Sequence, residues 1–271
     1  MATPMGKPAR RPSVAASYTP ETPRLVRALS IEPSPRRVRA FFAGVPIADS
    51  RRVMLVFEPQ RMPVYWFPRT DVHADLLRPA GLDATASPAV DRWTLRVGDR
   101  VAERAAWSYP KPGPEQAALT DHIAFFWDKL DTWFEEDDEV FVHPRDPYHR
   151  VDVLRSSRNV RVELEGQVVA ETRRPFLLFE TGEPVRYYIP KLDVRRELLE
   201  RSDKTVRSPY KGLAVYWSLR LNGMVFEDIV WSYPQPIPEC PKIEDLLCFL
   251  NERTDIAIDG ELQERPVTSW S

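Results

Sequence analysis

The sequence has little cysteine and little glycine, and each scarcity excludes a class of protein. Its two cysteines, Cys240 and Cys248, are too few for a disulfide framework, and neither lies in a Cys/His metal-binding spacing. With 10 glycines among 271 residues, the chain also lacks the phosphate-binding patterns GxGxxG and GxxxxGK[ST]. The sequence therefore indicates no cofactor.

Long apolar runs and an excess of charge are also missing. No segment approaches the roughly 18 apolar residues needed to cross a membrane, and the N-terminus lacks the apolar stretch of a secretion signal. Lysine and arginine number 38 against 40 aspartates and glutamates, whereas nucleic-acid binding through bulk charge needs a cationic surplus. We expect a cytoplasmic protein with no membrane partner and no nucleic-acid partner.

Proline and aromatic side chains are abundant instead. The 27 prolines outnumber the glycines, and 8 Trp, 9 Tyr and 12 Phe accompany them. Proline is excluded from helix interiors, and aromatic residues favour strands. The composition predicts short strands joined by rigid turns, and the 43% hydrophobic residues suffice for packed cores.

One stretch of about a hundred residues occurs twice, a length typical of a domain. ADSRR (48–52) is matched by AETRR (170–174), at a spacing of 122 residues. After a two-residue insertion in the second copy, WSYPKPGPE (107–115) is matched by WSYPQPIPE (231–239). This repeat is far longer than a solenoid unit, so each copy is expected to be a domain with its own core.

The repeat divides the chain into four parts. Residues 1–34, rich in Pro, Ala, Ser and Arg, are expected to form an extended or disordered arm, and residues 35–140 the first repeat domain. Residues 141–155 are expected to be a linker, and residues 156–271 the second repeat domain.

Alternating apolar residues predict hairpins within each copy. In the second copy one turn falls at Glu165-Gly166 or at Gly166-Gln167, and another at Asn222-Gly223, a dipeptide typical of two-residue hairpin loops. Two short helices are expected, over 194–201 after an N-cap at Asp193, and over 243–251. The predicted fold class is mainly β, β-rich with one or two short helices per domain, in two tandem homologous domains.

The second copy contains three distinctive segments: VRVELEGQVVAETRRPFLLFETGEPVRYYIPKLDV, SPYKGLAVYWSLRLNG and EDIVWSYPQPIPE. These segments resemble the successive motifs of a bacterial family, domain of unknown function 427, which also carries a nucleotidyltransferase-like label. The resemblance covers roughly 36–140 and 158–262, and it implies that each copy is a small, strongly curved β domain. The sequence has no spaced carboxylate pair for two-metal nucleotidyl transfer, so it does not support that label.

The copies differ at one polar turn, which indicates that the second copy is the functional half. It has SPYKG at 208–212, where the first copy has ASPAV at 86–90, without lysine or tyrosine. The resemblance implies that cysteine is common at the position of Ser208, which leaves open whether serine replaces a functional thiol. Lys211 is either a partly desolvated or anion-binding lysine, or a solvated lysine in a turn.

A pocket is expected beside this turn. Glu180 and Asp193 could position Lys211 or Arg174, although Asp193 could equally cap a helix. Tyr187 and the next tyrosine point to opposite faces of a strand, so only one of them can face a pocket. The WSYP tyrosine and tryptophan form either a ligand wall or part of the core. The candidate ligand-binding residues are Arg174, Glu180, Tyr187, Asp193, Tyr210, Lys211, Gly212, Trp231 and Tyr233.

The linker contains a His-x2-Asp-x2-His string formed by His143, Asp146 and His149. Zinc and iron use such ligands, but two intervening prolines and the lack of a fourth ligand disfavour a metal site. We expect no metal here.

The sequence supports three functions. The first is binding of a small polar or anionic ligand in an aromatic-walled pocket of the second repeat, with a small molecule as the partner. The second is an enzyme that uses Lys211 and Glu180 as acid/base or charge-stabilising groups. The third is a scaffold or partner-binding module that presents exposed prolines and aromatic side chains.

Overall fold

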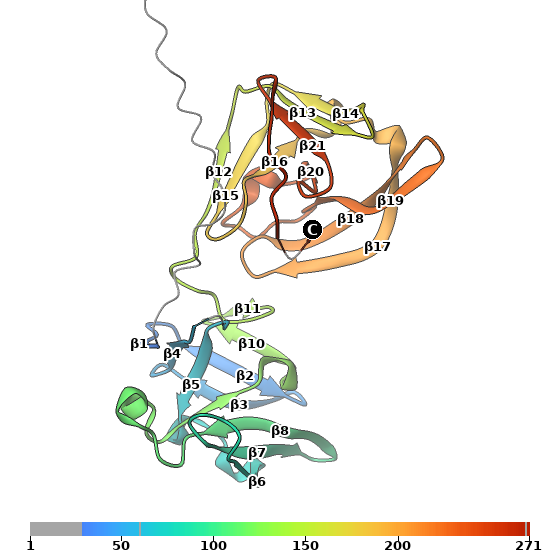
Figure 1. The fold of residues 1–271 in the computed structure, drawn as a ribbon. Helices are drawn as coiled ribbons and strands as arrows, with labels where there is room; N and C mark the ends of the chain where they lie inside the picture. The colour runs from blue at the N-terminus through green and yellow to red at the C-terminus, as the bar shows by residue number, and fades with distance from the viewer. Residues whose placement is uncertain (1–28, 60, 269) are drawn as a thin grey trace, which may run out of the picture.

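The structure, a computed structural model, describes residues 29–59, 61–268, 270 and 271. Figure 1 shows two bodies built of strands, one above the other, joined by a single connecting segment. In the described part of the chain, the helical segments are short 3-10 helices. The prediction of a mainly β fold in two tandem domains is confirmed.

The first repeat contains a seven-stranded sheet of order β1-β4-β5-β9-β8-β7-β6 and a four-stranded sheet of order β11-β10-β2-β3. The strands are β1 (Ser30–Pro33), β2 (Val38–Phe42), β3 (Val45–Ser50), β4 (Met54–Phe57), β5 (Val64–Pro68), β6 (Leu77–Asp83), β7 (Val90–Val97), β8 (Arg100–Ser108), β9 (His122–Phe125), β10 (Thr132–Glu135) and β11 (Asp138–Val140). The 3-10 helices are η1 (Arg69–Asp71), η2 (Ala74–Leu76), η3 (Pro114–Leu119) and η4 (Trp127–Lys129).

The second repeat has a seven-stranded sheet of order β12-β15-β16-β20-β19-β18-β17 and a four-stranded sheet of order β14-β13-β21-β22. The strands are β12 (Val151–Arg155), β13 (Val160–Leu164), β14 (Gln167–Thr172), β15 (Phe176–Glu180), β16 (Arg186–Ile189), β17 (Leu199–Ser208), β18 (Gly212–Leu221), β19 (Met224–Ser232), β20 (Leu247–Phe249), β21 (Asp255–Ile258) and β22 (Glu261–Leu262). The 3-10 helices are η5 (Lys191–Asp193), η6 (Arg196–Leu198) and η7 (Pro241–Ile243).

The two repeats share one topology. Each sheet of the second repeat has the strand order of its counterpart in the first, strand for strand. Each of the four buried clusters is also drawn from a single repeat. The duplication seen in the sequence is therefore a duplication of a complete fold with its own core.

An edge strand opens each repeat before the boundary that the sequence predicts. β1 pairs antiparallel with β4, although an arm is predicted up to residue 34. β12 pairs antiparallel with β15, although a linker is predicted up to residue 155. These edge strands are short and only partly buried, so they carry little of the alternation that marks a strand. The rest of the predicted arm, residues 1–28, lies outside the described residues.

The predicted hairpin turns are confirmed. Asn222 and Gly223 have φ of 52° and 79°, and Glu165 and Gly166 have φ of 49° and 70°. Two consecutive residues with positive φ are typical of the type I′ turn, whose twist matches that of paired strands.

The two helices predicted in the second repeat are wrong. Over 194–201 the structure has η6 followed by the start of β17, and over 243–251 it has the end of η7 followed by β20. β17 pairs with β18, and β20 lies between β16 and β19. Strand pairing satisfies backbone groups along one side of β17, which lies at the edge of its sheet, and along both sides of β20. This pairing outweighs a weak amphipathic pattern. Asp193 also makes no helix cap.

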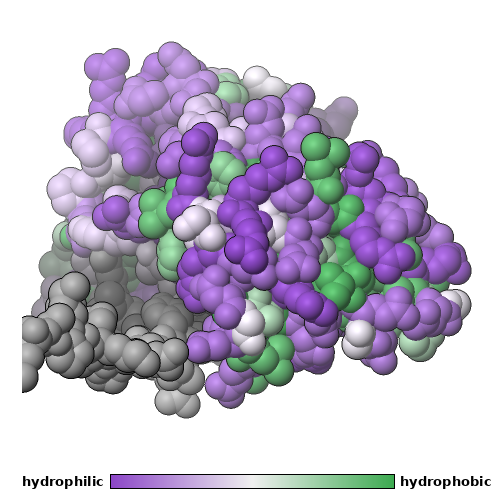
Figure 2. Space-filling view, turned by 90° about the horizontal axis from the view of Figure 1, so that it is seen from above, coloured by the Kyte–Doolittle hydropathy of each residue, from purple (hydrophilic) through white to green (hydrophobic). Residues whose placement is uncertain are grey.

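The second repeat presents a mostly hydrophilic surface. Figure 2 looks down on it from above and shows apolar side chains as separate groups between hydrophilic ones. A buried aromatic cluster lies within its seven-stranded sheet, formed by Tyr188, Tyr216, Trp231, Tyr233 and their neighbours. This cluster underlies the candidate site.

Candidate functional site

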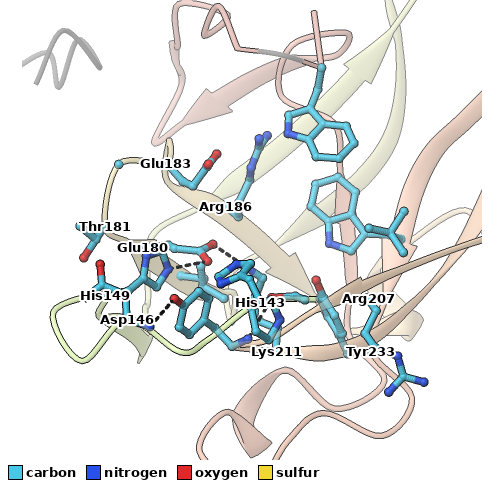
Figure 3. A pocket seen from close by; sticks show the side chains of 18 of the residues that line it. His143, Asp146, His149, Glu180, Thr181, Glu183, Arg186, Arg207, Lys211 and Tyr233 are labelled. Carbon is cyan, nitrogen blue, oxygen red and sulfur yellow. Dashed lines mark hydrogen bonds and ion pairs between the residues drawn. The ribbon is translucent and has the colours of Figure 1, made fainter. Parts of the chain in front are cut away.

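A cavity of about 900 Å³ is lined mainly by the second repeat (Figure 3). The second repeat supplies the ends of β15 and β16, the turn between β17 and β18, and parts of β19. The linker adds His143, Asp146, Tyr148 and His149. A volume of this size suits a small organic molecule.

A three-residue ion-pair network lies at one end of the cavity. The ammonium of Lys211 pairs with Oε2 of Glu180, and Nε2 of His149 lies 3.0 Å from Oε1 of the same carboxylate. The side chains of Glu180, Lys211 and His149 are 8%, 13% and 18% exposed. One largely buried carboxylate therefore holds two nitrogen groups, which Figure 3 shows converging on it. We call these residues the Lys-Glu-His network.

The network keeps Glu180 ionised. Burial raises the pKa of Glu180, whereas the hydrogen bond from His149 and the charge of Lys211 lower it, and the balance leaves its pKa below the ordinary value of 4.5. A carboxylate only accepts hydrogen bonds, so Nε2 of His149 is the donor. In the neutral tautomer that this contact selects, Nδ1 of His149 is an acceptor.

Tyr210 connects the turn to the linker. Its ring stacks on the imidazole of His149, with 3.9 Å between ring centroids and 16° between planes. Its hydroxyl accepts a hydrogen bond of 3.0 Å from the backbone N–H of Asp146. Burial raises the pKa of Tyr210 to about 12, so it stays a phenol at neutral pH. Two linker residues, Asp146 and His149, thus fix the turn that carries Lys211.

Aromatic side chains form a wall of the cavity. Nε1 of Trp231 donates a hydrogen bond of 3.2 Å to the hydroxyl of Tyr188, and the ring of Tyr216 lies 6.2 Å from that of Trp231. Burial raises the pKa of Tyr188 and of Tyr233 well above 10. The wall therefore offers rings and neutral hydroxyls. Two cations of the lining also lie over its rings, Arg186 over Trp231 at 5.5 Å and Lys204 over Tyr216 at 4.8 Å.

The second buried cation of the cavity is also paired. Arg186 donates two hydrogen bonds, of 2.7 and 2.8 Å, to Glu252, and the two side chains are 9% and 0% exposed. The hydroxyl of Thr268 donates a further bond of 2.6 Å to Glu252. Burial raises the pKa of Glu252, but the bonds from Arg186 and Thr268 outweigh burial and lower it.

Among the described residues that line the cavity, neither charge is in excess. Six cations face six carboxylates, the two histidines aside. The cations are Arg61, Arg186, Lys204, Arg207, Lys211 and Arg253, and the carboxylates are Glu58, Asp146, Glu180, Glu183, Glu227 and Asp228.

Five of the nine candidates from the sequence line this cavity: Glu180, Tyr210, Lys211, Trp231 and Tyr233. Four lie elsewhere. Tyr187 packs against the core on the other face of its strand, and Tyr188 takes the place at the cavity. Gly212 has φ of 106°, and a Cβ there would lie 3.1 Å from the backbone oxygen of Gln235. Glycine at 212 is thus required by close backbone packing.

Arg174 and Asp193 form a contact that both repeats share. Asp193 accepts bonds of 2.9 and 3.0 Å from Arg174 and one of 2.7 Å from the hydroxyl of Thr172. In the first repeat, Asp71 accepts the equivalent bonds from Arg52 and Ser50. A contact kept in both copies is explained by folding, and it lies outside the cavity.

Sequence reasoning missed His149, Tyr188 and Arg186. A signal for His149 was present, since two of the four histidines in the chain lie six positions apart in a linker rich in proline. The spacing of that string resembles a metal site and gives no sign of a hydrogen bond between His149 and Glu180. Over the residues that the structure describes, no group of three or more His, Cys, Asp or Glu side chains could hold a metal ion.

In the first repeat the matching aromatic side chains pack on one another. Trp66 corresponds to Tyr188, and Tyr109 to Tyr233, at the spacings of the repeat. Trp66 stacks on Tyr109 with 4.9 Å between centroids and meets the edge of Trp107 at 5.7 Å. Phe126 covers Trp107 at 4.4 Å. The first repeat thus uses these positions for packing.

Fold and site together define a tandem β-domain protein with one aromatic-walled cavity beside its second domain. The family model of Domain of unknown function (DUF427) matches residues 30–136 and 152–260, so the chain belongs to this family as a two-copy member. No curated protein matches the chain. Among the described residues, no helix is both long and apolar enough to cross a membrane.

Proposed function

We propose that the second repeat binds a small polar ligand in the cavity, between the Lys-Glu-His network and the aromatic wall. The network carries the proposal: Lys211, Glu180 and His149 are largely buried, yet they face a cavity of about 900 Å³. Burying three ionisable groups is costly, and a folding core does not need them. Ligand sites commonly combine such a polar cluster with ring faces.

The charge pattern favours a polar ligand over a strongly anionic one. Lys211 is neutralised by Glu180, and Arg186 by Glu252. An anion would have to displace a carboxylate from one of these cations, whereas a neutral group can accept from Lys211 or His149 while the pairs stay intact. The rings of Tyr216 and Trp231 suit a flat portion of the same molecule, which would share them with Lys204 and Arg186.

A screen of polar aromatic compounds by thermal shift tests the proposal. We expect compounds that raise the melting temperature of the parent chain and fail to raise that of the double variant Lys211→Met/Glu180→Gln, in which both charges are removed together. Lys191→Met is the matched control, because Lys191 pairs with Asp245 on the surface, outside the cavity. Equal shifts in the parent and the double variant would place the ligand elsewhere.

A second candidate, an acid/base enzyme, is favoured by one contact. Glu180 orients His149 through Nε2, which leaves Nδ1 as an acceptor able to take a proton from a bound substrate. Lys211 would then stabilise negative charge at the same place. In assays with p-nitrophenyl acetate and p-nitrophenyl phosphate, turnover by the parent should fall in His149→Gln and persist in Lys191→Met. Turnover that is equal in His149→Gln contradicts this role.

A further inference from the structure

The first repeat contributes residues to the cavity of the second. Phe57 ends β4, and Arg61, Met62 and Pro63 lie in the loop that leads to β5. These residues and Glu58 line the same cavity as the Lys-Glu-His network. We call the described residues 57–59 and 61–63 the β4–β5 loop.

The linker fixes where this loop lies. The hydroxyl of Tyr148 donates a bond of 2.7 Å to Glu32 on β1, and its ring lies 5.9 Å from that of Phe57. The next residue, His149, binds Glu180 of the second repeat. Of two adjacent linker residues, Tyr148 therefore contacts the first repeat and His149 contacts the second. An ion pair of 2.9 Å between Arg145 and Glu239 adds a further contact to the second repeat.

The duplicated positions have acquired different roles. Glu58 corresponds to Glu180 at the spacing of the repeat. Glu180 holds Lys211 and His149, whereas Glu58 pairs with Arg61 at 2.6 Å within its own loop. Both carboxylates nevertheless line one cavity. In the first repeat the rings that match the aromatic wall pack on one another. Its β4–β5 loop instead borders the cavity of the second repeat.

We propose that the ligand is held between the repeats, with the β4–β5 loop of the first repeat as one wall of the site. The inference rests on the proposed function and extends it to an elongated ligand. Its polar end meets the Lys-Glu-His network, its flat part lies along the aromatic wall, and its far end contacts Met62. The side chain of Met62 is 55% exposed, so a ligand that covers it removes apolar surface from water.

Site-directed blocking tests this wall. Met62→Cys is labelled with a bulky maleimide, and binding of 6-propionyl-2-(dimethylamino)naphthalene, an uncharged, flat and elongated probe with a carbonyl group at one end, is followed by fluorescence in the full chain. The native Cys240 and Cys248 are 2% and 0% exposed and do not compete for the label. The matched control is labelled Leu82→Cys. Leu82 is 59% exposed on β6, at the end of the first repeat far from the second (Figure 1).

We expect saturable binding in the parent, at least a tenfold loss of affinity in labelled Met62→Cys, and no loss in labelled Leu82→Cys. Unchanged affinity in labelled Met62→Cys, with affinity lost in Lys211→Met/Glu180→Gln, would overturn the shared wall and leave the proposed function standing. Binding that survives in both, or no saturable binding in the parent, would overturn the proposed function and with it this inference.

Discussion

At the scale of single residues, the ion pair of Lys211 and Glu180 governs both stability and binding. Lys211→Met leaves a carboxylate that is 8% exposed with His149 as its remaining hydrogen-bond partner. We expect a loss of about 2 kcal/mol in the free energy of unfolding, because an unpaired buried charge is costly. The loss is measured by urea denaturation.

The double variant Lys211→Met/Glu180→Gln should recover part of that loss, since it removes the orphaned charge. Lys191→Met should stay within about 0.5 kcal/mol of the parent, as is usual for an exposed site. A Lys211→Met variant as stable as the parent would show that the pair contributes nothing to folding.

The lowered pKa of Glu180 predicts a pH dependence. The folded pKa lies below 4.5, the ordinary value to which it returns on unfolding. Its stabilising contribution is therefore complete above that value and is lost as the pH falls through the folded pKa. The difference in unfolding free energy between the parent and Glu180→Gln should be largest at neutral pH and shrink in acid. A difference that is constant with pH would contradict the ionised state of Glu180.

The sequence located part of the site for a definite reason. Lys211 and Tyr210 are distinctive because the first copy lacks them at the matching positions. Glu180 is a carboxylate that the sequence predicts near that turn. Arg174 and Asp193 correspond to Arg52 and Asp71 of the first copy. A pattern shared by both copies indicates a role in folding. His149 and Tyr188 reach the cavity through the path of the linker and the face of a strand, which composition and spacing leave undetermined.

At the scale of elements, the hairpin turns were predictable because local chemistry decides them. At Gly223 the φ of 79° opposes any β-branched residue, even though a Cβ would meet nothing within 4 Å. Gly223→Val should lower the free energy of unfolding by about 1 kcal/mol or more. Met224→Val is the matched control, since Met224 follows Gly223 directly, lies within β19 and is 47% exposed. Equal melting temperatures of the two variants would contradict the turn.

The failed helices show the limit of local patterns. The segments 194–201 and 243–251 both contain spaced apolar residues, but their partners are strands distant in sequence. Non-local pairing decides such segments, and a single sequence does not display it. The edge strands β1 and β12 escaped prediction for the related reason that one side of each is unpaired.

At the scale of the whole molecule, each repeat should fold alone. The clusters that contain Ile189, Ile229 and Phe249 lie entirely within the second repeat. A fragment of residues 151–271 should unfold cooperatively in urea. The shorter fragment 156–271 lacks β12, which pairs along its length with β15, so we expect it to be less stable. Two unfolded fragments, beside a folded full chain, would show that the repeats depend on each other.

Adjacent anchors at Tyr148 and His149 make the order of the halves matter. A chain rebuilt with the second repeat first would keep both folds, since each has a complete set of strands. It would separate Tyr148 from Glu32 or His149 from Glu180, and the spacing between the halves would no longer be specified. The two repeats share one topology. Because the linker binds each repeat through a different residue, their positions in the chain are no longer equivalent. Glu32 of the first repeat and Glu180 of the second are therefore each bound to one of two adjacent linker residues, and among the described residues neither contact has an equivalent in the other repeat's place in the chain.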